Sequence, residues 1–149
     1  MNQIILLDTG PLGMVTNPKA NSICQDCKRW LSGLEALGDR VALPEISDYE
    51  LRRELLRAGK RQGIRQLDQL KETIAYLPIT TEVMTKAAEL WAQARNQGYP
   101  TASSDALDGD VILAAQAVIL RSQGYDEIIA TTNVGHLSRF TIAKTWQEI

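Results

Sequence analysis

The sequence predicts a three-layer α/β/α protein in which a central, mostly parallel sheet lies between helices. Three observations support this: short apolar segments alternate with longer amphipathic ones, glycine or proline separates many of them, and no segment repeats. Strands that alternate with helices favour parallel pairing, with helices on both faces of the sheet. The length of 149 residues suits a single domain over residues 1–149 that buries a core without disulfides.

Each expected strand is a short, largely apolar run bounded by polar or turn-forming residues. The first is followed by Asp8-Thr9-Gly10-Pro11, in which the proline suits the first turn of a helix. The expected strands are Ile4–Leu7, Val41–Leu43, Ala75–Ile79, Glu127–Thr132 and, at an edge of the sheet, Ile142–Trp146.

Apolar residues at helical spacing predict helices between these strands. Ser47 or Asp48 is expected to cap the helix after the second strand. Gly59 and Gly63 are expected to interrupt that helix. The other expected long helices cover roughly residues 22–37, 64–73, 81–98 and 110–123, with a polar loop over 101–108.

Composition and charge exclude several classes of protein. Hydrophobic residues make up 44% and charged residues 23% of the chain, as in soluble globular proteins. No apolar run is long enough to cross a bilayer, and the run before Asp8 is too short for a signal peptide. We therefore expect a cytoplasmic protein without a membrane partner. The net charge of −2 argues against a strongly basic nucleic-acid-binding protein, so the local charge pattern matters more.

The two cysteines, Cys24 and Cys27, form a Cys-x-x-Cys pair. A zinc site would need two further good ligands, but the chain has one histidine and no other cysteine. A redox pair should follow a strand and open a helix, whereas this pair lies within the expected helix 22–37. We interpret the pair as incidental.

Three carboxylates lie where the predicted fold brings distant segments together. Asp8 follows the first strand, Glu50 lies in the first turn of its helix, and Asp110 begins the last long helix. Each alone has a structural explanation, as a cap or as a favourable charge at a helix start. Together at one sheet edge they would repel one another unless a cation lay between them. Oxygen ligands alone favour Mg²⁺ or Mn²⁺, which can activate water and stabilise charge on a phosphate.

A basic segment follows Glu50 directly. Arg53, Arg57, Arg61 and Arg65 recur every four residues and would form one stripe on a continuous helix. The stripe is either a solvated face, a track for phosphates, or a surface for an acidic partner. Arg53 and Arg57 are our candidate RNA-binding residues.

Four motifs, spread over nearly the whole chain, match a known pattern in order and spacing. They are a strand followed by Asp-Thr in Ile4–Leu12, a strand leading into Glu-Leu in Leu43–Leu51, the apolar helix Asp110–Ala117, and a strand followed by threonine in Ile129–Leu137. The pattern resembles the PIN domain family and, within it, the VapC-type toxins of toxin–antitoxin pairs. The resemblance implies that Asp8, Glu50 and Asp110 bind metal and that the reaction is hydrolysis of RNA phosphodiester bonds.

The same resemblance implies an endoribonuclease toxin of a type II toxin–antitoxin pair, which forms a homodimer and is silenced by a cognate antitoxin. One alternative is a catalytically weak or inactive PIN-like module that binds RNA or a protein partner. Another is a metal-dependent phosphatase or phosphotransferase with Asp8 as the nucleophile. The last is the weakest, because the chain has no glycine-rich phosphate-binding loop.

The sequence departs from the family pattern at the fourth acidic position, which falls on Asn133. An asparagine can coordinate a cation or position a water, but it adds no charge. Asp108 or Asp105 could supply the missing charge. Gly10 also replaces the asparagine that the family often has two residues after its first aspartate.

Neighbouring residues compete for some of these roles. Glu54 shares a helix face with Glu50, but Glu50 lies at the helix start and is therefore preferred. Glu45 lies too close to the strand. His136, the one histidine, is interpreted as a polar loop residue, because carboxylate–metal nucleases need no histidine base.

Overall fold

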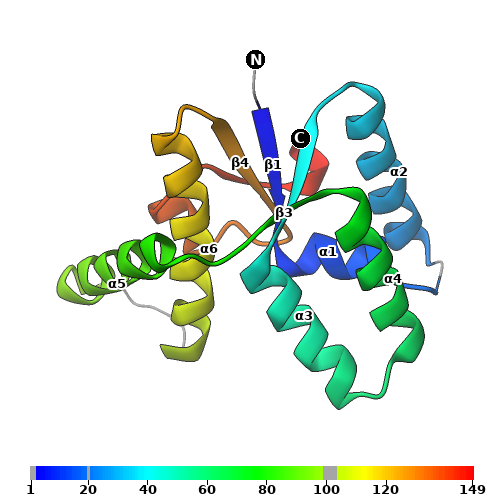
Figure 1. Ribbon diagram of the computed structural model, residues 1–149, viewed down its shortest axis with the longest axis horizontal. Coiled ribbons are helices and arrows are strands. Elements are labelled where there is room, and N and C mark those ends of the chain that lie inside the picture. The colour runs from blue at the N-terminus through cyan, green and yellow to red at the C-terminus, as the bar shows by residue number, and fades with distance from the viewer. Residues whose placement is uncertain (1–2, 20, 99–103) are drawn as a thin grey trace.

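One five-stranded sheet forms the centre of the molecule in the computed structural model, which describes residues 3–19, 21–98 and 104–149 (Figure 1). The strands are β1 (Gln3–Leu7), β2 (Arg40–Pro44), β3 (Ala75–Leu77), β4 (Asp126–Thr131) and β5 (Ala143–Thr145). Their order is β3-β2-β1-β4-β5, and all four neighbouring pairs are parallel. The parallel sheet and the position of the last strand at an edge confirm the sequence predictions.

Helices connect the strands. They are α1 (Thr9–Thr16), α2 (Ser22–Ala36), α3 (Glu45–Arg57), α4 (Arg61–Thr73), α5 (Thr81–Asn96) and α6 (Ser104–Ser122), with short 3₁₀ turns at Leu137–Arg139 and Trp146–Glu148. In the part of the chain that the structure describes, no helix is both long and apolar enough to span a membrane.

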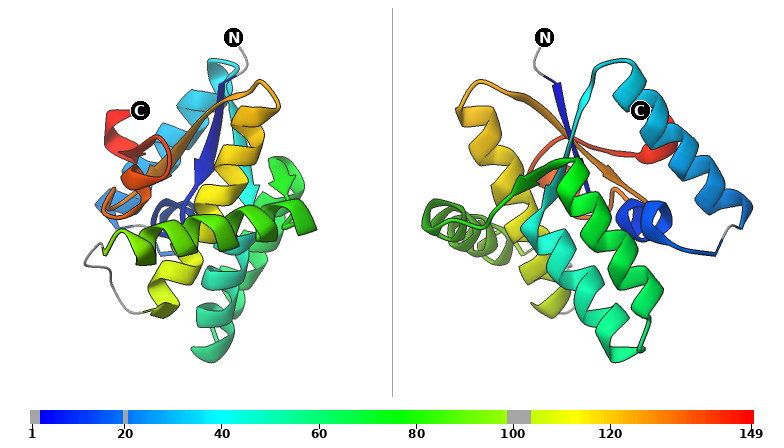
Figure 2. Two further views of the ribbon diagram at one scale, coloured as in Figure 1. Left: turned by 90° about the vertical axis from the view of Figure 1, so that its left-hand side faces the viewer. Right: turned by 45° about the vertical axis from the view of Figure 1, so that its right-hand side comes forward.

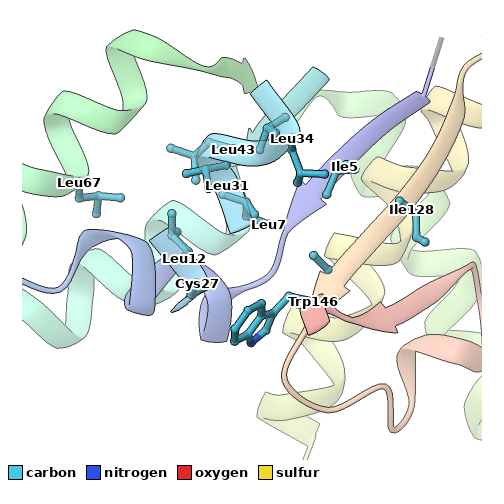
Figure 3. Close-up of a cluster of buried hydrophobic side chains, with 12 residues drawn as sticks. Ile5, Leu7, Leu12, Cys27, Leu31, Leu34, Leu43, Leu67, Ile128 and Trp146 are labelled. Atoms are coloured by element: carbon cyan, nitrogen blue, oxygen red, sulfur yellow. The ribbon is translucent and has the colours of Figure 1, made fainter. Parts of the chain in front are cut away.

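The alternation of side chains along β1 divides the core between the two faces of the sheet. Ile5 and Leu7 face a cluster with residues of α1, α2 and α4 and with Trp146 (Figure 3). Ile4 and Leu6 face the other cluster, to which α6 contributes Leu113, Ala117 and Leu120. Helix α5 packs on the outer side of α6 rather than on the sheet (Figure 2). The three predicted layers are therefore present, with α5 as an additional cover.

Both cysteines belong to the helix–sheet packing. Cys24 and Cys27 are free and buried, and Cys27 lies in the cluster around Leu12 and Trp146. Burial, with a smaller contribution from Cys24, raises the pKa of the Cys27 thiol to about 12. A thiol with so high a pKa is a poor nucleophile and a poor metal ligand. These contacts agree with an incidental pair of packing residues.

Helix α3 begins earlier than predicted. It starts at Glu45, directly after the last residue of β2, so neither Ser47 nor Asp48 caps it. Glu50 therefore lies in the second turn of α3 and not, as predicted, in the first turn. Both side chains are buried instead, and Asp48 accepts a hydrogen bond from Arg52 at 3.1 Å. The proline that closes β2 is also the N-cap residue, so strand and helix meet without a loop.

Only one of the two predicted interruptions exists. The chain turns at Gly59, whose φ of +67° favours glycine, and α4 begins at Arg61. Gly63 lies inside α4, where an added Cβ would come 2.9 Å from Leu55 Cδ2. Gly63 therefore allows α3 and α4 to pack closely and does not end a helix.

Helix α6 also begins earlier than predicted. It starts at Ser104, so Asp110 lies in its second turn rather than at its start, and the predicted polar loop is helical from residue 104 onward. The buried Leu107 lies in this additional segment, within the cluster between α5 and α6. Packing against α5 thus stabilises a helical turn that the polar sequence did not suggest. Residues 101–103 of the expected loop lie outside the described residues.

Candidate metal centre

Asp8 lies at the carboxyl end of the central strand. Its N–H donates to the Ala130 carbonyl at 2.9 Å, which continues the pairing of β1 with β4. Its carboxylate caps α1 by accepting from the Thr9 N–H at 2.8 Å, and its other oxygen accepts from the Thr131 hydroxyl at 2.8 Å. Asp8 is therefore held by two strand ends and one helix start, and its expected capping role is combined with a place at the site.

Glu50 reaches the same edge from α3. Its Oε1 accepts from the Thr9 hydroxyl at 3.0 Å, so Thr9 contacts both Asp8 and Glu50. Its Oε2 lies against α6, where a Cβ added to Gly109 would come within 2.5 Å. The lack of a side chain at Gly109 thus provides the space that the Glu50 carboxylate occupies beside Asp110.

Asp110 completes the group from α6. Burial is the largest cause of its raised pKa, which is about 6, and the charges of Asp8 and Glu50 raise it further. Burial also raises the pKa values of Asp8 and Glu50 above their ordinary values, against the hydrogen bonds that lower them. The three carboxylates are therefore close enough to repel one another, as expected from the sequence.

The donor set fits a hard divalent cation, because it consists of carboxylate oxygens in a half-buried position. A cation would offset the repulsion that raises the pKa of Asp110. Among the described residues, no group of three or more histidine, cysteine, aspartate or glutamate side chains is arranged to hold an ion as it stands. Binding one ion with all three carboxylates would therefore require a side chain to reorient.

Asn133, at the fourth acidic position of the family pattern, differs from the three carboxylates in its exposure and contacts. Asn133 is exposed, and its Oδ1 accepts from the Gly135 N–H at 3.0 Å. Its backbone N–H donates to the Thr131 hydroxyl at 3.2 Å, so Asn133 is linked to the residue that holds Asp8. The side chain shapes the turn after β4 and adds no charge to the site.

Asp108, one of the two aspartates considered as a source of the missing charge, does not join this group. Asp108 lines a groove between α5 and α6 with Met84 and Trp91. Residues two apart on a helix point about 200° apart, which agrees with Asp108 facing α5 while Asp110 faces Asp8. The side chain of Asp105 lies outside the described part of the chain.

The competing acidic residues and the histidine lie elsewhere. Glu54 is exposed and pairs with Arg57 at 2.9 Å. Glu45 accepts from the Ile79 N–H at 2.6 Å and so links α3 to the segment after β3. His136 is half-buried, directly before the turn Leu137–Arg139. The geometry therefore places Glu50 in the site in preference to Glu54 and Glu45.

The four arginines do not form one stripe, because the turn at Gly59 divides them between α3 and α4. Arg53 lies closest to the carboxylates, and its charge lowers the pKa of Glu50 against the larger effect of burial. Its guanidinium carbon lies 5.1 Å from the centre of the Tyr49 ring. Arg57 donates two hydrogen bonds to Glu54 and forms a salt bridge with it.

Sequence reasoning did not assign roles to Thr9, Thr131 and Gly109. Thr131 ends β4 and Thr9 opens the helix that follows β1, and these positions were an available signal. Gly109 had no such signal, because its role depends on the approach of Glu50 from another helix.

A parallel α/β fold with carboxylates at the carboxyl edge of its central strand defines a recognisable class of acidic site. The chain belongs to the PIN domain family, whose model matches residues 5–134. No curated protein is significantly similar to the chain.

Solved structures with low sequence identity share the fold. A chain of the VapBC2 complex from Rickettsia felis, bound to a promoter DNA fragment, has a TM-score of 0.74 at 18% identity, covering 96% of this chain and 98% of that chain. A chain of VapBC-1 from nontypeable Haemophilus influenzae has a TM-score of 0.69 at 20% identity, covering 97% and 98%. The sarcin–ricin loop cleaving toxin VapC20 from Mycobacterium tuberculosis has a TM-score of 0.62 at 16% identity, covering 92% and 96%. These likenesses establish the PIN fold.

Proposed function

We propose that this protein is a metal-dependent endoribonuclease, the toxin of a type II toxin–antitoxin pair, which hydrolyses RNA phosphodiester bonds. The observation that carries the proposal is the convergence of Asp8, Glu50 and Asp110, where burial and, after it, the charges of Asp8 and Glu50 raise the pKa of Asp110 to about 6. These three residues would hold Mg²⁺ or Mn²⁺. A bound cation of this kind supplies an activated water and stabilises the charge that develops on the attacked phosphate.

The chain's own residues prepare the site for that reaction. The Thr131 and Thr9 hydroxyls orient the Asp8 and Glu50 carboxylates, as outer hydrogen bonds commonly orient metal ligands. Arg53, next to Glu50, would bind an RNA phosphate, and Arg57 would do so one turn further along α3 once released from Glu54.

The similar solved structures support a proposal about its partners. VapC20 is described as a toxin that cleaves the sarcin–ricin loop, and two of the similar chains come from VapBC complexes. We infer that this chain acts on RNA in the cytoplasm, forms a homodimer, and is silenced by a cognate antitoxin.

Cleavage of purified RNA tests the proposal. Activity should require Mg²⁺ or Mn²⁺ and stop when EDTA is added. Asp8→Asn and Asp110→Asn should each reduce the rate by more than about 100-fold, because loss of a group that merely orients a ligand already costs 10–100-fold. Asp108→Asn, two residues from Asp110 but facing α5, is the matched control and should retain the rate. Full activity in both site variants would refute the assignment.

A second candidate is a PIN-like module with weak or absent catalysis that binds RNA or a protein. The observation that favours it is the neutral Asn133, whose side-chain oxygen is used in its own turn. Titration calorimetry with Mn²⁺ separates the two candidates. Binding at or below millimolar metal, strengthened in Asn133→Asp, supports the nuclease; no binding at millimolar metal supports the module.

A further inference from the structure

An exposed aromatic ring lies directly beside the candidate metal centre. Tyr49 precedes Glu50 on α3 and is 56% exposed, so it contributes little to the core. Two exposed rings among the described residues carry an arginine over them: Tyr49 with Arg53, and Trp91 with Arg95 at 5.2 Å. Only the first of these pairs adjoins the three carboxylates, because Trp91 lies on α5, outside α6 (Figure 1).

Helix geometry brings Tyr49, Glu50 and Arg53 together as one patch, here called the Tyr49 patch. Arg53 follows Tyr49 by four residues and Glu50 by three, so it lies one turn above both. Its guanidinium is 5.1 Å from the Tyr49 ring centre, and its charge acts on Glu50. The patch therefore presents an aromatic face and a cation next to a group that would hold the reactive metal.

Stability does not account for this arrangement. An exposed cation–π pair contributes little to folding, and a tyrosine in solvent gains nothing from burial. An exposed aromatic ring and an arginine beside a candidate metal centre instead suit single-stranded nucleic acid, since bases stack on the ring while the cation binds a phosphate.

We propose that the Tyr49 patch binds one unpaired nucleotide of the RNA beside the phosphate that is cut, with its base on the Tyr49 ring and a phosphate on Arg53. This inference rests on the proposed ribonuclease function. Bases within an RNA duplex are already stacked and cannot cover the ring, so the Tyr49 patch contacts the RNA only at an unpaired nucleotide. Stacking tolerates any base, so the patch selects unpaired structure rather than sequence.

Fluorescence of a modified RNA measures this stacking directly. The probe is an unstructured RNA oligonucleotide with 2-aminopurine at one position, moved along the strand in a series, and binding is measured in EDTA to prevent cleavage. Because the patch has no base preference, binding to the full-length protein should quench 2-aminopurine at each internal position. Tyr49→Leu should abolish that quenching and weaken RNA binding by about 5- to 100-fold, the range expected for one base–aromatic stack. Tyr49→Phe should retain both.

Trp91→Leu is the matched control, because it removes the other ring that lies under an arginine. It should leave quenching and affinity unchanged, and melting curves should show that every variant is folded. A duplex of the same sequence should bind with no difference between the wild type and Tyr49→Leu. Equal quenching and affinity in the wild type and Tyr49→Leu would overturn the proposal.

The same face of α3 could contact protein instead. Leu56, seven residues after Tyr49, is 64% exposed and lies on the same side of the helix. If the patch were a contact with a second copy, Leu56→Ala and Tyr49→Leu would both change the elution volume in size-exclusion chromatography, and this result would also overturn the proposal.

Failure of this inference is distinguishable from failure of the ribonuclease proposal. Cleavage by the wild type together with unchanged binding in Tyr49→Leu refutes the stacking role alone. Tyr49-dependent quenching without metal-dependent cleavage refutes the catalytic function and leaves the binding role of the patch intact.

Discussion

At the residue scale, burial and the nearby charges of Asp8 and Glu50 raise the pKa of Asp110. Its pKa is about 6 in the folded chain, against an ordinary value of 3.8. Protonation therefore favours the folded state: this contribution to stability is fully present below pH 3.8 and is lost as the pH rises through 6. In the metal-free protein near pH 8, the Asp110 carboxylate should be destabilising.

Asp110→Asn should therefore raise the melting temperature of the metal-free protein near pH 8. A shift of one pKa unit corresponds to about 1.4 kcal/mol, and partial exposure reduces the total effect to about 1–2 kcal/mol. That amounts to roughly 3–6 °C for a domain of this size. The gain should disappear near pH 4. Scanning calorimetry from pH 4 to 8 measures it, with Asp108→Asn as a control that should show no such trend.

Thr131 is the second residue with a specific expected effect. Its hydroxyl donates to Asp8 and accepts from the Asn133 N–H at 3.2 Å, so Thr131→Val removes both hydrogen bonds while it keeps the side-chain volume. Metal affinity or cleavage rate should fall by about 10–100-fold, as for other groups that orient metal ligands. Metal titrations of the cleavage rate test this. Thr132→Val, one residue on and exposed, should behave as the wild type, and equal losses in both variants would contradict the role of Thr131.

At the element scale, the approach of α3 to α6 depends on Gly109. A Cβ there would come within 2.5 Å of Glu50 Oε2, so Gly109→Ala should displace the Glu50 carboxylate outward. RNA cleavage should fall at least about 10-fold because an ångström-scale misplacement costs that much or more. The melting temperature should change little, because alanine favours a helix. Gly33→Ala, in α2 with nothing within 4 Å, should leave activity intact.

A buried acidic residue connects α3 to its neighbours. Asp48 accepts from Arg52 on its own helix, Arg52 also pairs with Asp68 of α4 at 2.8 Å, and the Tyr76 hydroxyl of β3 donates to Asp48 at 3.4 Å. Asp48→Ala should destabilise the protein by about 1–3 kcal/mol, since the Tyr76 hydroxyl and Lys71 lose a partner while Arg52 keeps Asp68. Urea unfolding measures this. Glu54→Ala, which breaks an exposed pair with Arg57, should cost less than about 1 kcal/mol.

At the scale of the whole molecule, the proposed function has a cellular consequence. Expression of the wild-type chain alone should arrest growth, because an unsilenced ribonuclease degrades essential RNA. Asp8→Asn should abolish the arrest, and coexpression of the cognate antitoxin should do the same for the wild type. Growth curves after induction provide the measurement, with protein levels compared by immunoblotting. Normal growth with abundant, folded wild-type protein would argue for the non-catalytic module.

Much of the fold and several candidate site residues could be predicted from local sequence patterns. The buried run Ile4–Leu7 and the turn residues after it determined the central strand, and the alternation of elements determined a parallel sheet with helices on both faces. The order of the four motifs indicated the family. The resemblance to that family singled out Asp8, Glu50 and Asp110 as candidate site residues. These features depend on periodicity and chain order, which the sequence carries directly.

Only the tertiary structure decided the rest, because it depends on contacts between segments distant in the chain. The start of α6 depends on Leu107 packing against α5, and the position of Glu50 depends on the space at Gly109 and the Thr9 hydroxyl. The pairing of Tyr49 with Arg53 beside the carboxylates likewise required side-chain geometry. The sequence by itself thus determined the order of the elements and predicted which acidic residues form the candidate site. Packing and electrostatic repulsion, which act across the sheet edge, decided how they are arranged there.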